Sequence, residues 1–131
     1  MSNKTKKNRM LVSVVDDDES VRESLPDLLR ELGYSTEAFS SAADFLSSGH
    51  LDQTSCLILD IAMPGMSGID LQRELTRRNH DIPIVFITAH GNEMIRREVL
   101  QRGAVECLSK PFTDDALLRA LGNALSRSRR K

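Results

Sequence analysis

Five side chains in this sequence are of the types that could hold a cation and move an anionic group. Asp16, Asp17, Asp60, Thr88 and Lys110 each end or closely follow a short apolar run. Three carboxylates without nearby histidine or cysteine suit a hard cation that prefers oxygen ligands, Mg²⁺ above all. A lysine reaches an anion as a point charge, and a threonine hydroxyl adds a hydrogen bond. These residue types together favour phosphoryl transfer to a carboxylate.

The first carboxylates belong to a run of four acids, Asp16-Asp17-Asp18-Glu19, behind the apolar segment 10–15. Neighbouring acids repel one another by about 1 kcal/mol per pair in water. A single aspartate would be enough to cap the helix that follows. The additional carboxylates therefore favour a cation site over a purely structural role.

Asp60 follows the apolar residues 57–59, which have the pattern of a strand buried on both faces. Pro64-Gly65 favours a turn, and Ser67 with Asp70 has the spacing of a capping box at a helix start. Within this stretch alone, a turn-capping aspartate explains the pattern as well as a functional one. The choice depends on what lies beside Asp60 in the fold.

The chain alternates strand and helix patterns five times, which predicts a parallel sheet covered by helices on both faces. Right-handed crossovers then bring the carboxyl ends of all strands to one edge, where such sheets bind ligands. The five side chains follow four different strands, so we expect them to converge there rather than form a Lys–Asp pair that merely orders loops. The predicted strands cover 10–15, 35–39, 57–59, 82–87 and 104–108, and the predicted helices cover 21–32, 42–46, 69–79, 92–102 and 114–125.

Composition restricts the possible classes of protein. The 131 residues suffice for one domain, and Cys56 and Cys107 lie in apolar runs without metal-ligand spacing, as expected for core residues in a reducing compartment. No run suits a membrane span or a signal peptide, so we predict a cytoplasmic protein that does not contact a membrane. Residues 10–126 carry ten basic and nineteen acidic residues, which argues against direct nucleic-acid binding. The only lysine among them is Lys110.

The motifs at 14–18, 59–68, 87–89 and 110–112 together resemble those of a bacterial response-regulator receiver domain. The sequence is most similar to the FixJ-like branch of transcriptional regulators, and the resemblance spans residues 9–126. It implies a flavodoxin-like (βα)₅ fold, with a doubly wound parallel sheet of five strands in the order 2-1-3-4-5. Residues 1–8 would then be a basic tail, and residues 127–131 a basic tail or the start of a linker.

The resemblance also implies roles for the acidic residues. Asp60 would accept a phosphoryl group from a sensor histidine kinase. Asp17, Asp60 and the backbone carbonyl of Ala62 would hold Mg²⁺, with Asp16 acting directly or through water. The domain would phosphorylate and dephosphorylate itself at Asp60 without being a turnover enzyme.

The remaining implied roles concern the phosphoryl oxygens and the signal. Lys110 and Thr88 would bind these oxygens, and the peptide bond between Lys110 and Pro111 would be cis. Receiver domains usually place an aromatic switch residue three positions before the lysine, where this sequence has Cys107. We therefore expect Thr88 to carry the switch while Cys107 packs passively.

The signal is expected to leave through the face of the fourth helix, fifth strand and fifth helix. Met94, Ile95 and Val99 are predicted to form a small exposed apolar patch there, which suits a phosphorylation-dependent homodimer. Arg96-Arg97 stands in the same helix where relatives tend to be apolar or small, so the partner surface is expected to be unusual. Output would be control of transcription, through an effector domain that these residues do not include.

Three other classes of protein could use similar residues. A phosphatase of the haloacid-dehalogenase type would need a second aspartate where Ala62 stands. A flavin-binding module would need a phosphate loop rich in glycine and hydroxyl groups after the first strand, where this sequence has only carboxylates. A stand-alone or degenerate receiver that binds partners without phosphorylation remains the alternative to a phosphorylated switch.

Overall fold

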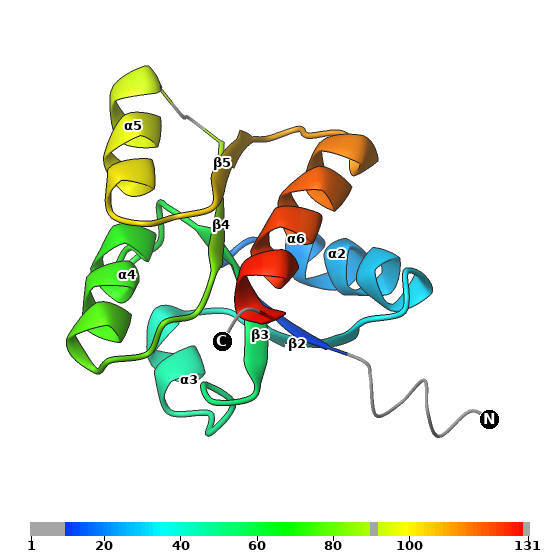
Figure 1. The fold of residues 1–131 in the computed structure, drawn as a ribbon, viewed down its shortest axis with the longest axis horizontal. Helices are drawn as coiled ribbons and strands as arrows, with labels where there is room; N and C mark the ends of the chain where they lie inside the picture. Colours follow the sequence, from blue (N-terminus) through cyan, green and yellow to red (C-terminus); the bar gives the residue numbers. More distant parts are fainter. Residues whose placement is uncertain (1–9, 90–91, 130–131) are drawn as a thin grey trace.

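Five parallel strands form a single sheet in the order β2-β1-β3-β4-β5 (Figure 1). This computed structural model describes residues 10–89 and 92–129. The predicted flavodoxin-like fold and strand order are confirmed. The strands are β1 (Leu11–Val15), β2 (Ser35–Phe39), β3 (Thr54–Asp60), β4 (Ile84–Thr88) and β5 (Glu106–Ser109).

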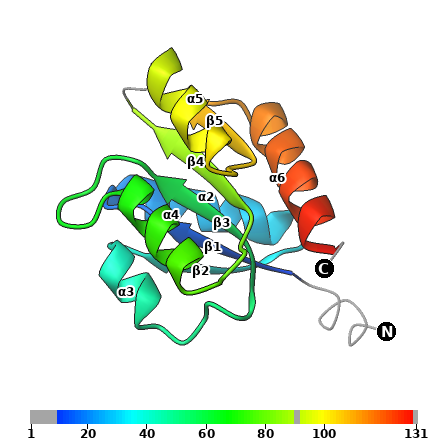
Figure 2. The same cartoon turned by 60° about the vertical axis from the view of Figure 1, so that its left-hand side comes forward.

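Helices cover both faces of the sheet, as the alternating pattern predicts. Two helices pack on one face and three on the other, and Figures 1 and 2 show the two layers from different sides. The first face carries α2 (Glu19–Glu31) and α6 (Asp114–Arg129), and the second carries α3 (Ala42–Leu46), α4 (Gly68–Arg77) and α5 (Glu93–Gln101).

Strand burial follows the position of each strand in the sheet. The central strands β3 and β4 are almost entirely buried, whereas β2 at the edge is half exposed, as its weaker apolar pattern predicts. Strand β3 begins earlier than expected, at Thr54, whose hydroxyl shares a buried hydrogen bond with Ser13 of β1. Asp60 and Thr88 are the last residues of their strands, so both stand at the carboxyl edge of the sheet.

Capping side chains define the helix starts around this edge. Ser67 and Asp70 form the predicted capping box at the start of α4. Gly65, in the preceding turn, has a φ of 76°, which a glycine adopts without strain. Asp18 is the N-cap of α2 and accepts from the backbone N–H of Ser20. One member of the acidic run therefore caps the helix, and the others are left for another role.

Two apolar clusters form the core, one on each face of the sheet. Cys56 and Cys107 are buried and free, as predicted, and lie in different clusters. Helix α6 continues to Arg129, into the segment 127–131 that we expected to be a tail or linker. The predicted basic tail at residues 1–8 lies outside the described residues. Within the described ranges, no helix combines the length and apolar character that crossing a membrane requires.

One surface prediction is wrong. Val99 was expected in an exposed apolar patch with Met94 and Ile95, but its side chain is fully buried against the sheet. Ile95 is half buried, and only Met94 is largely exposed, at 79%. The helix is short and places every fourth side chain against the core, so Ile95 and Val99 face inward together.

Candidate functional site

The structure brings the predicted site residues together at the carboxyl edge of the sheet. The carboxylate oxygens of Asp16, Asp17 and Asp60 lie within 4.8 Å of one another. Thr88 and Lys110 line the cavity of about 330 Å³ into which Asp17 and Asp60 face. Four strand ends therefore contribute to one polar pocket, which a loop-capping aspartate would not require.

Asp16 is the buried anchor of the pocket. Its side chain is fully buried, and one carboxylate oxygen accepts from the backbone N–H of Asp18 at 2.9 Å. The other oxygen accepts from the Lys110 ammonium at 2.9 Å. Its backbone is held as well, because Asp16 N–H donates to Phe39 of β2 and the Arg22 guanidinium donates to the Asp16 carbonyl. These bonds fix the direction in which its carboxylate points.

Lys110 connects the two buried carboxylates. Its Nζ lies 2.9 Å from Asp16 Oδ2 and 4.0 Å from Asp60 Oδ1. Its backbone N–H donates to the Thr88 carbonyl at 2.8 Å, which couples the lysine to the end of β4. Burial alone would lower the pKa of Lys110, but the hydrogen bond and charge of Asp16 outweigh it and raise that pKa. The peptide bond to Pro111 is cis, as the resemblance implies.

Asp60 is the most perturbed carboxyl of the group. Burial and the negative charge of Asp16 raise the pKa of Asp60 to about 7, although Lys110 acts in the opposite direction. One ammonium is therefore too little positive charge for this cluster of carboxylates. A divalent cation would supply the rest.

The donor set fits the predicted magnesium ion. All three carboxylates offer hard oxygen ligands, and neither histidine nor cysteine lines this cavity in the described part of the chain. Ala62 also lines the cavity, beside Asp60 and Ile61. The role of Ala62 as a ligand stays a prediction.

Sequence reasoning missed the close contact that holds the Asp60 loop. A Cβ atom at Gly68 would overlap the backbone carbonyl oxygen of Asp60, and Gly68 N–H donates to Ile61 O at 2.9 Å. The start of α4 therefore rests directly on the backbone of the central carboxylate. A glycine in a predicted helix start gave no sign of this, because the contact depends on how the loop folds back.

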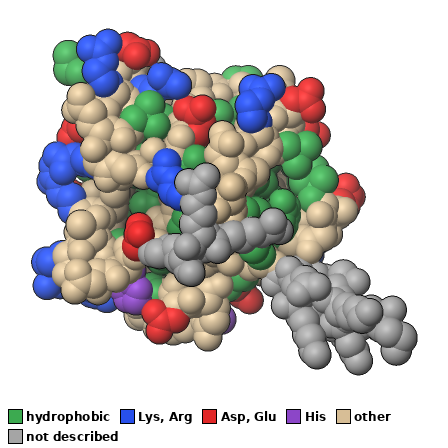
Figure 3. All heavy atoms as spheres, viewed as in Figure 1, with side chains coloured by type: hydrophobic (Ala, Val, Ile, Leu, Met, Phe, Trp, Pro, Cys, Tyr) green, Lys and Arg blue, Asp and Glu red, His purple; other side chains and the backbone are tan. Residues whose placement is uncertain are grey.

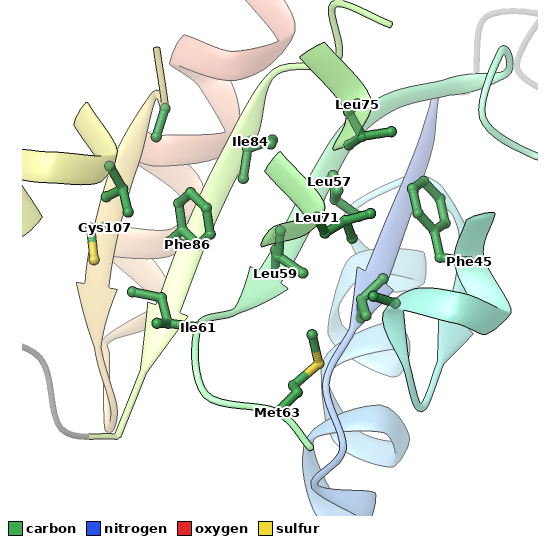
Figure 4. Packing of buried hydrophobic residues seen from close by; sticks show 14 of the residues in the cluster. Phe45, Leu57, Leu59, Ile61, Met63, Leu71, Leu75, Ile84, Phe86 and Cys107 are labelled. Atoms are coloured by element: carbon green, nitrogen blue, oxygen red, sulfur yellow. The ribbon is translucent and has the colours of Figure 1, made fainter. Parts of the chain in front are cut away.

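Cys107 occupies the predicted switch position on β5. Figure 4 shows it on the same face of the sheet as Phe86 of β4 and Ile61. Its side chain belongs to the apolar cluster, and burial is the main cause of the raised pKa of its thiol. These surroundings fit passive packing, and the part that Cys107 plays in switching stays a prediction.

Residues 12–122, most of the chain, match the family profile described as the response regulator receiver domain. The chain belongs to this family. The receiver domain is 47% identical over 123 residues to Nodulation protein W of Bradyrhizobium diazoefficiens, a match covering 94% of this chain and 54% of that protein. It is 39% identical to the transcriptional regulatory protein FixJ of Azorhizobium caulinodans, over 89% of this chain and 56% of FixJ. The expected likeness to the FixJ branch is confirmed.

A solved structure gives the same result. The structure of the response regulator StyR superposes with a TM-score of 0.87 at 48% identity, covering 93% of this chain and 62% of that one. The receiver domain spans about half the length of the curated relatives it matches. The matched region therefore corresponds to only part of each of those longer proteins.

Proposed function

We propose that Asp60 accepts a phosphoryl group from a sensor histidine kinase in a reaction that requires Mg²⁺. The observation that carries this proposal is the position of Lys110, between the carboxylates of Asp16 and Asp60 at the edge of the sheet. A structural ion pair would need one carboxylate, whereas phosphoryl transfer needs a carboxylate to attack and cations to neutralise the transferred group.

In the proposed step, a carboxylate oxygen of Asp60 forms a bond to phosphorus as the bond from phosphorus to the donor's imidazole nitrogen breaks. The electron pair of the broken bond stays on the imidazole. Asp17, Asp60 and the backbone carbonyl of Ala62 would hold Mg²⁺, with Asp16 acting directly or through water. When bound, the ion would neutralise charge on the phosphoryl oxygens. Lys110 donates to one phosphoryl oxygen, and Thr88 donates its hydroxyl to another.

The proposed output is control of transcription, through an effector domain outside these 131 residues. The support is the FixJ relative, a transcriptional regulatory protein almost twice the length of the matched region. We further propose that the receiver domain acts in the cytoplasm, without direct contact to nucleic acid or membrane. Two free buried cysteines and the acidic composition of residues 10–126 support this assignment.

The phosphoacceptor is tested with a small-molecule donor, which removes the need to know the kinase. Incubation with acetyl phosphate and Mg²⁺ should add one phosphoryl group that hydroxylamine removes, as expected for an acyl phosphate. Asp60→Asn should abolish labelling. The control is Asp70→Asn, which changes an exposed capping-box aspartate outside the pocket and should label like the parent. An unlabelled parent would favour the alternative of a receiver that binds partners without phosphorylation.

We also propose that phosphorylation promotes a weak homodimer through the face of α5, β5 and α6. The burial of Val99 leaves Met94 as the main exposed apolar side chain of α5. Arg96 reaches across to Glu106 of β5 at 3.1 Å, so this surface is more polar than the sequence predicted. A dimer held by so small a patch should be transient.

Sedimentation with and without beryllofluoride, an analogue of the phosphoryl group, tests this association. The parent should form dimers only when the analogue and Mg²⁺ are present, and Met94→Ser should weaken them. A Cys107→Phe variant tests whether the cysteine is passive. If only Cys107→Phe responds to the analogue, the passive role of Cys107 is wrong.

A further inference from the structure

Gln72 is a buried amide between α4 and α5, on the same face of the sheet as Cys107 but outside the carboxylate pocket. Its side chain is 4% exposed. Its Nε2 donates to the carbonyl of Val99 at 3.4 Å and to the carbonyl of Arg102 at 3.5 Å. Val99 lies in the last turn of α5 and Arg102 is its C-cap, so Gln72 of one helix binds the end of another.

The other half of this amide is left without a partner. The Oε1 atom of Gln72 is buried and accepts no hydrogen bond from the residues that the structure describes. A leucine or methionine would fill a similar volume without an unsatisfied polar atom. Gln72 is therefore unfavourable as core packing, and its two donated bonds are what an apolar side chain could not supply.

Open grooves lie between these helix ends at the surface, and few other contacts join α4 to α5, which makes the two bonds more important. Two cavities, of about 290 and 80 Å³, are both lined by Gln72, Thr76 and Arg102. Within α5 only Val99 is fully buried, so few apolar contacts fix this helix. The bonds from Gln72 are thus a specific connection at a loosely packed end.

The opposite end of α5 lies at the carboxylate pocket. Asn92 caps its first turn, and Ile95 lines the same cavity as Asp60 and Thr88. The helix therefore extends from the proposed phosphorylation site to the Gln72 amide. A change in the pocket would act on its first turn, while the Gln72 bonds act on its last.

We propose that Gln72 anchors the C-terminal end of α5 as a pivot. With its last turn held, a displacement near Thr88 turns the first half of α5 outward instead of shifting the whole helix. The pivot would thus position Met94 and Arg97 on the surface for a partner. This inference rests on the proposed phosphorylation of Asp60.

Amide hydrogen exchange of the intact 131-residue chain tests the pivot, in the parent, Gln72→Leu and Thr76→Val. Thr76 lines the same cavities, but its hydroxyl donates within α4, to the carbonyl of Gln72 itself. Without beryllofluoride, Gln72→Leu should speed exchange of the Gly103 and Ala104 amides, which close the end of α5, by about tenfold. Thr76→Val should leave these two amides at the parent's rates.

Addition of beryllofluoride with Mg²⁺ tests whether the last turn of α5 stays in place while its first turn responds. In the parent and in Thr76→Val, exchange should change at residues 93–96 and not at 99–102. In Gln72→Leu the change should extend along the whole helix. Its melting temperature should equal or exceed that of the parent, because the unsatisfied oxygen is gone, and Gln72→Met serves as the second variant if the leucine does not fold.

The results separate this inference from the proposed function. Parent-like exchange in Gln72→Leu, with and without the analogue, would overturn the pivot while leaving Asp60 as phosphoacceptor. If the parent ignores the analogue, the proposed function fails, and the pivot fails with it. In that case the amide exchange rates of Gly103 and Ala104 still show whether Gln72 holds the end of α5 without the analogue.

Discussion

The two faces of the sheet differ in how their helices are held. On one face, α6 places Leu117, Leu121 and Leu125 against the sheet with at most 6% exposure, beside an equally apolar stripe of α2. On the other face, α5 buries one side chain completely, lies beside open grooves at α4 and accepts the hydrogen bonds of the Gln72 amide at its last turn. Fewer buried side chains therefore hold α5 than α6.

Charged side chains cover the outer surfaces of α4 and α5. Figure 3 shows basic side chains along the side of the molecule that α4 and α5 form. Many of these arginines pair with acids of their own helix, as Arg77 and Arg78 do with Glu74. Such exposed pairs contribute little stability, so α4 and α5 are held mainly by their inner surfaces. Under the proposed function, α2 and α6 would stay fixed on one face while α5 responds on the other.

The largest expected effect comes from replacing a leucine by alanine, and its size should differ between the two faces. Leu121→Ala on α6 should lower the free energy of unfolding by about 2–5 kcal/mol, because the side chain is fully buried. Leu100→Ala on α5 should cost less than half as much, since Leu100 is only partly buried. Urea denaturation measures both. Equal losses would mean that α5 is packed as firmly as α6.

Two glycine-to-alanine substitutions test the contact between the start of α4 and the backbone of Asp60. Gly68→Ala should destabilise the fold by about 1–3 kcal/mol, because the added methyl group meets the Asp60 carbonyl. Gly122→Ala on α6 is the matched control, since nothing lies within 4 Å of its added methyl group. Alanine there should stabilise the helix by about 0.5–1 kcal/mol. The contact is refuted if Gly68→Ala unfolds at the same urea concentration as the parent.

Asp17→Asn removes one repelling charge from the pocket without touching the core of either face. The melting temperature without metal should rise by a few degrees, because three carboxylates there face a single lysine. Phosphorylation by acetyl phosphate should be lost. Millimolar Mg²⁺ should stabilise the parent by mass action but not the variant. A parent that melts at the same temperature with and without Mg²⁺ would count against a metal site.

The pH dependence of stability tests the raised pKa of Asp60. Because the pKa of Asp60 is raised from 3.8 to about 7, the folded protein keeps a proton on Asp60 that the unfolded chain has already released. Its contribution to stability is therefore present at low pH and is lost as pH rises through about 7. Without divalent ions, the parent should lose more stability than Asp60→Asn between about pH 5 and about pH 8. If urea denaturation gives the same change in the free energy of unfolding for both proteins between these pH values, this linkage is excluded.

The sequence predicts the carboxylate site well because each residue is tied to a strand end. Asp60 and Thr88 follow strongly apolar segments, and the parallel topology alone brings those ends together. Val99 shows where such reasoning fails: α5 has a weak apolar pattern, so the direction of its inner face could not be fixed from spacing. The contacts of Gly68 and Gln72 join segments that fold back on one another, and neither leaves a local signal in the sequence.

Backbone NMR shifts upon adding beryllofluoride and Mg²⁺ test the central claim most directly, namely that the pocket at Asp60 takes a phosphoryl group and moves one face. This claim predicts large shifts at Asp60, Thr88 and residues 92–97, small ones at the buried Leu121 and Leu125 of α6, and none in Asp60→Asn. No shifts in the parent, or shifts of equal size on both faces, would contradict it.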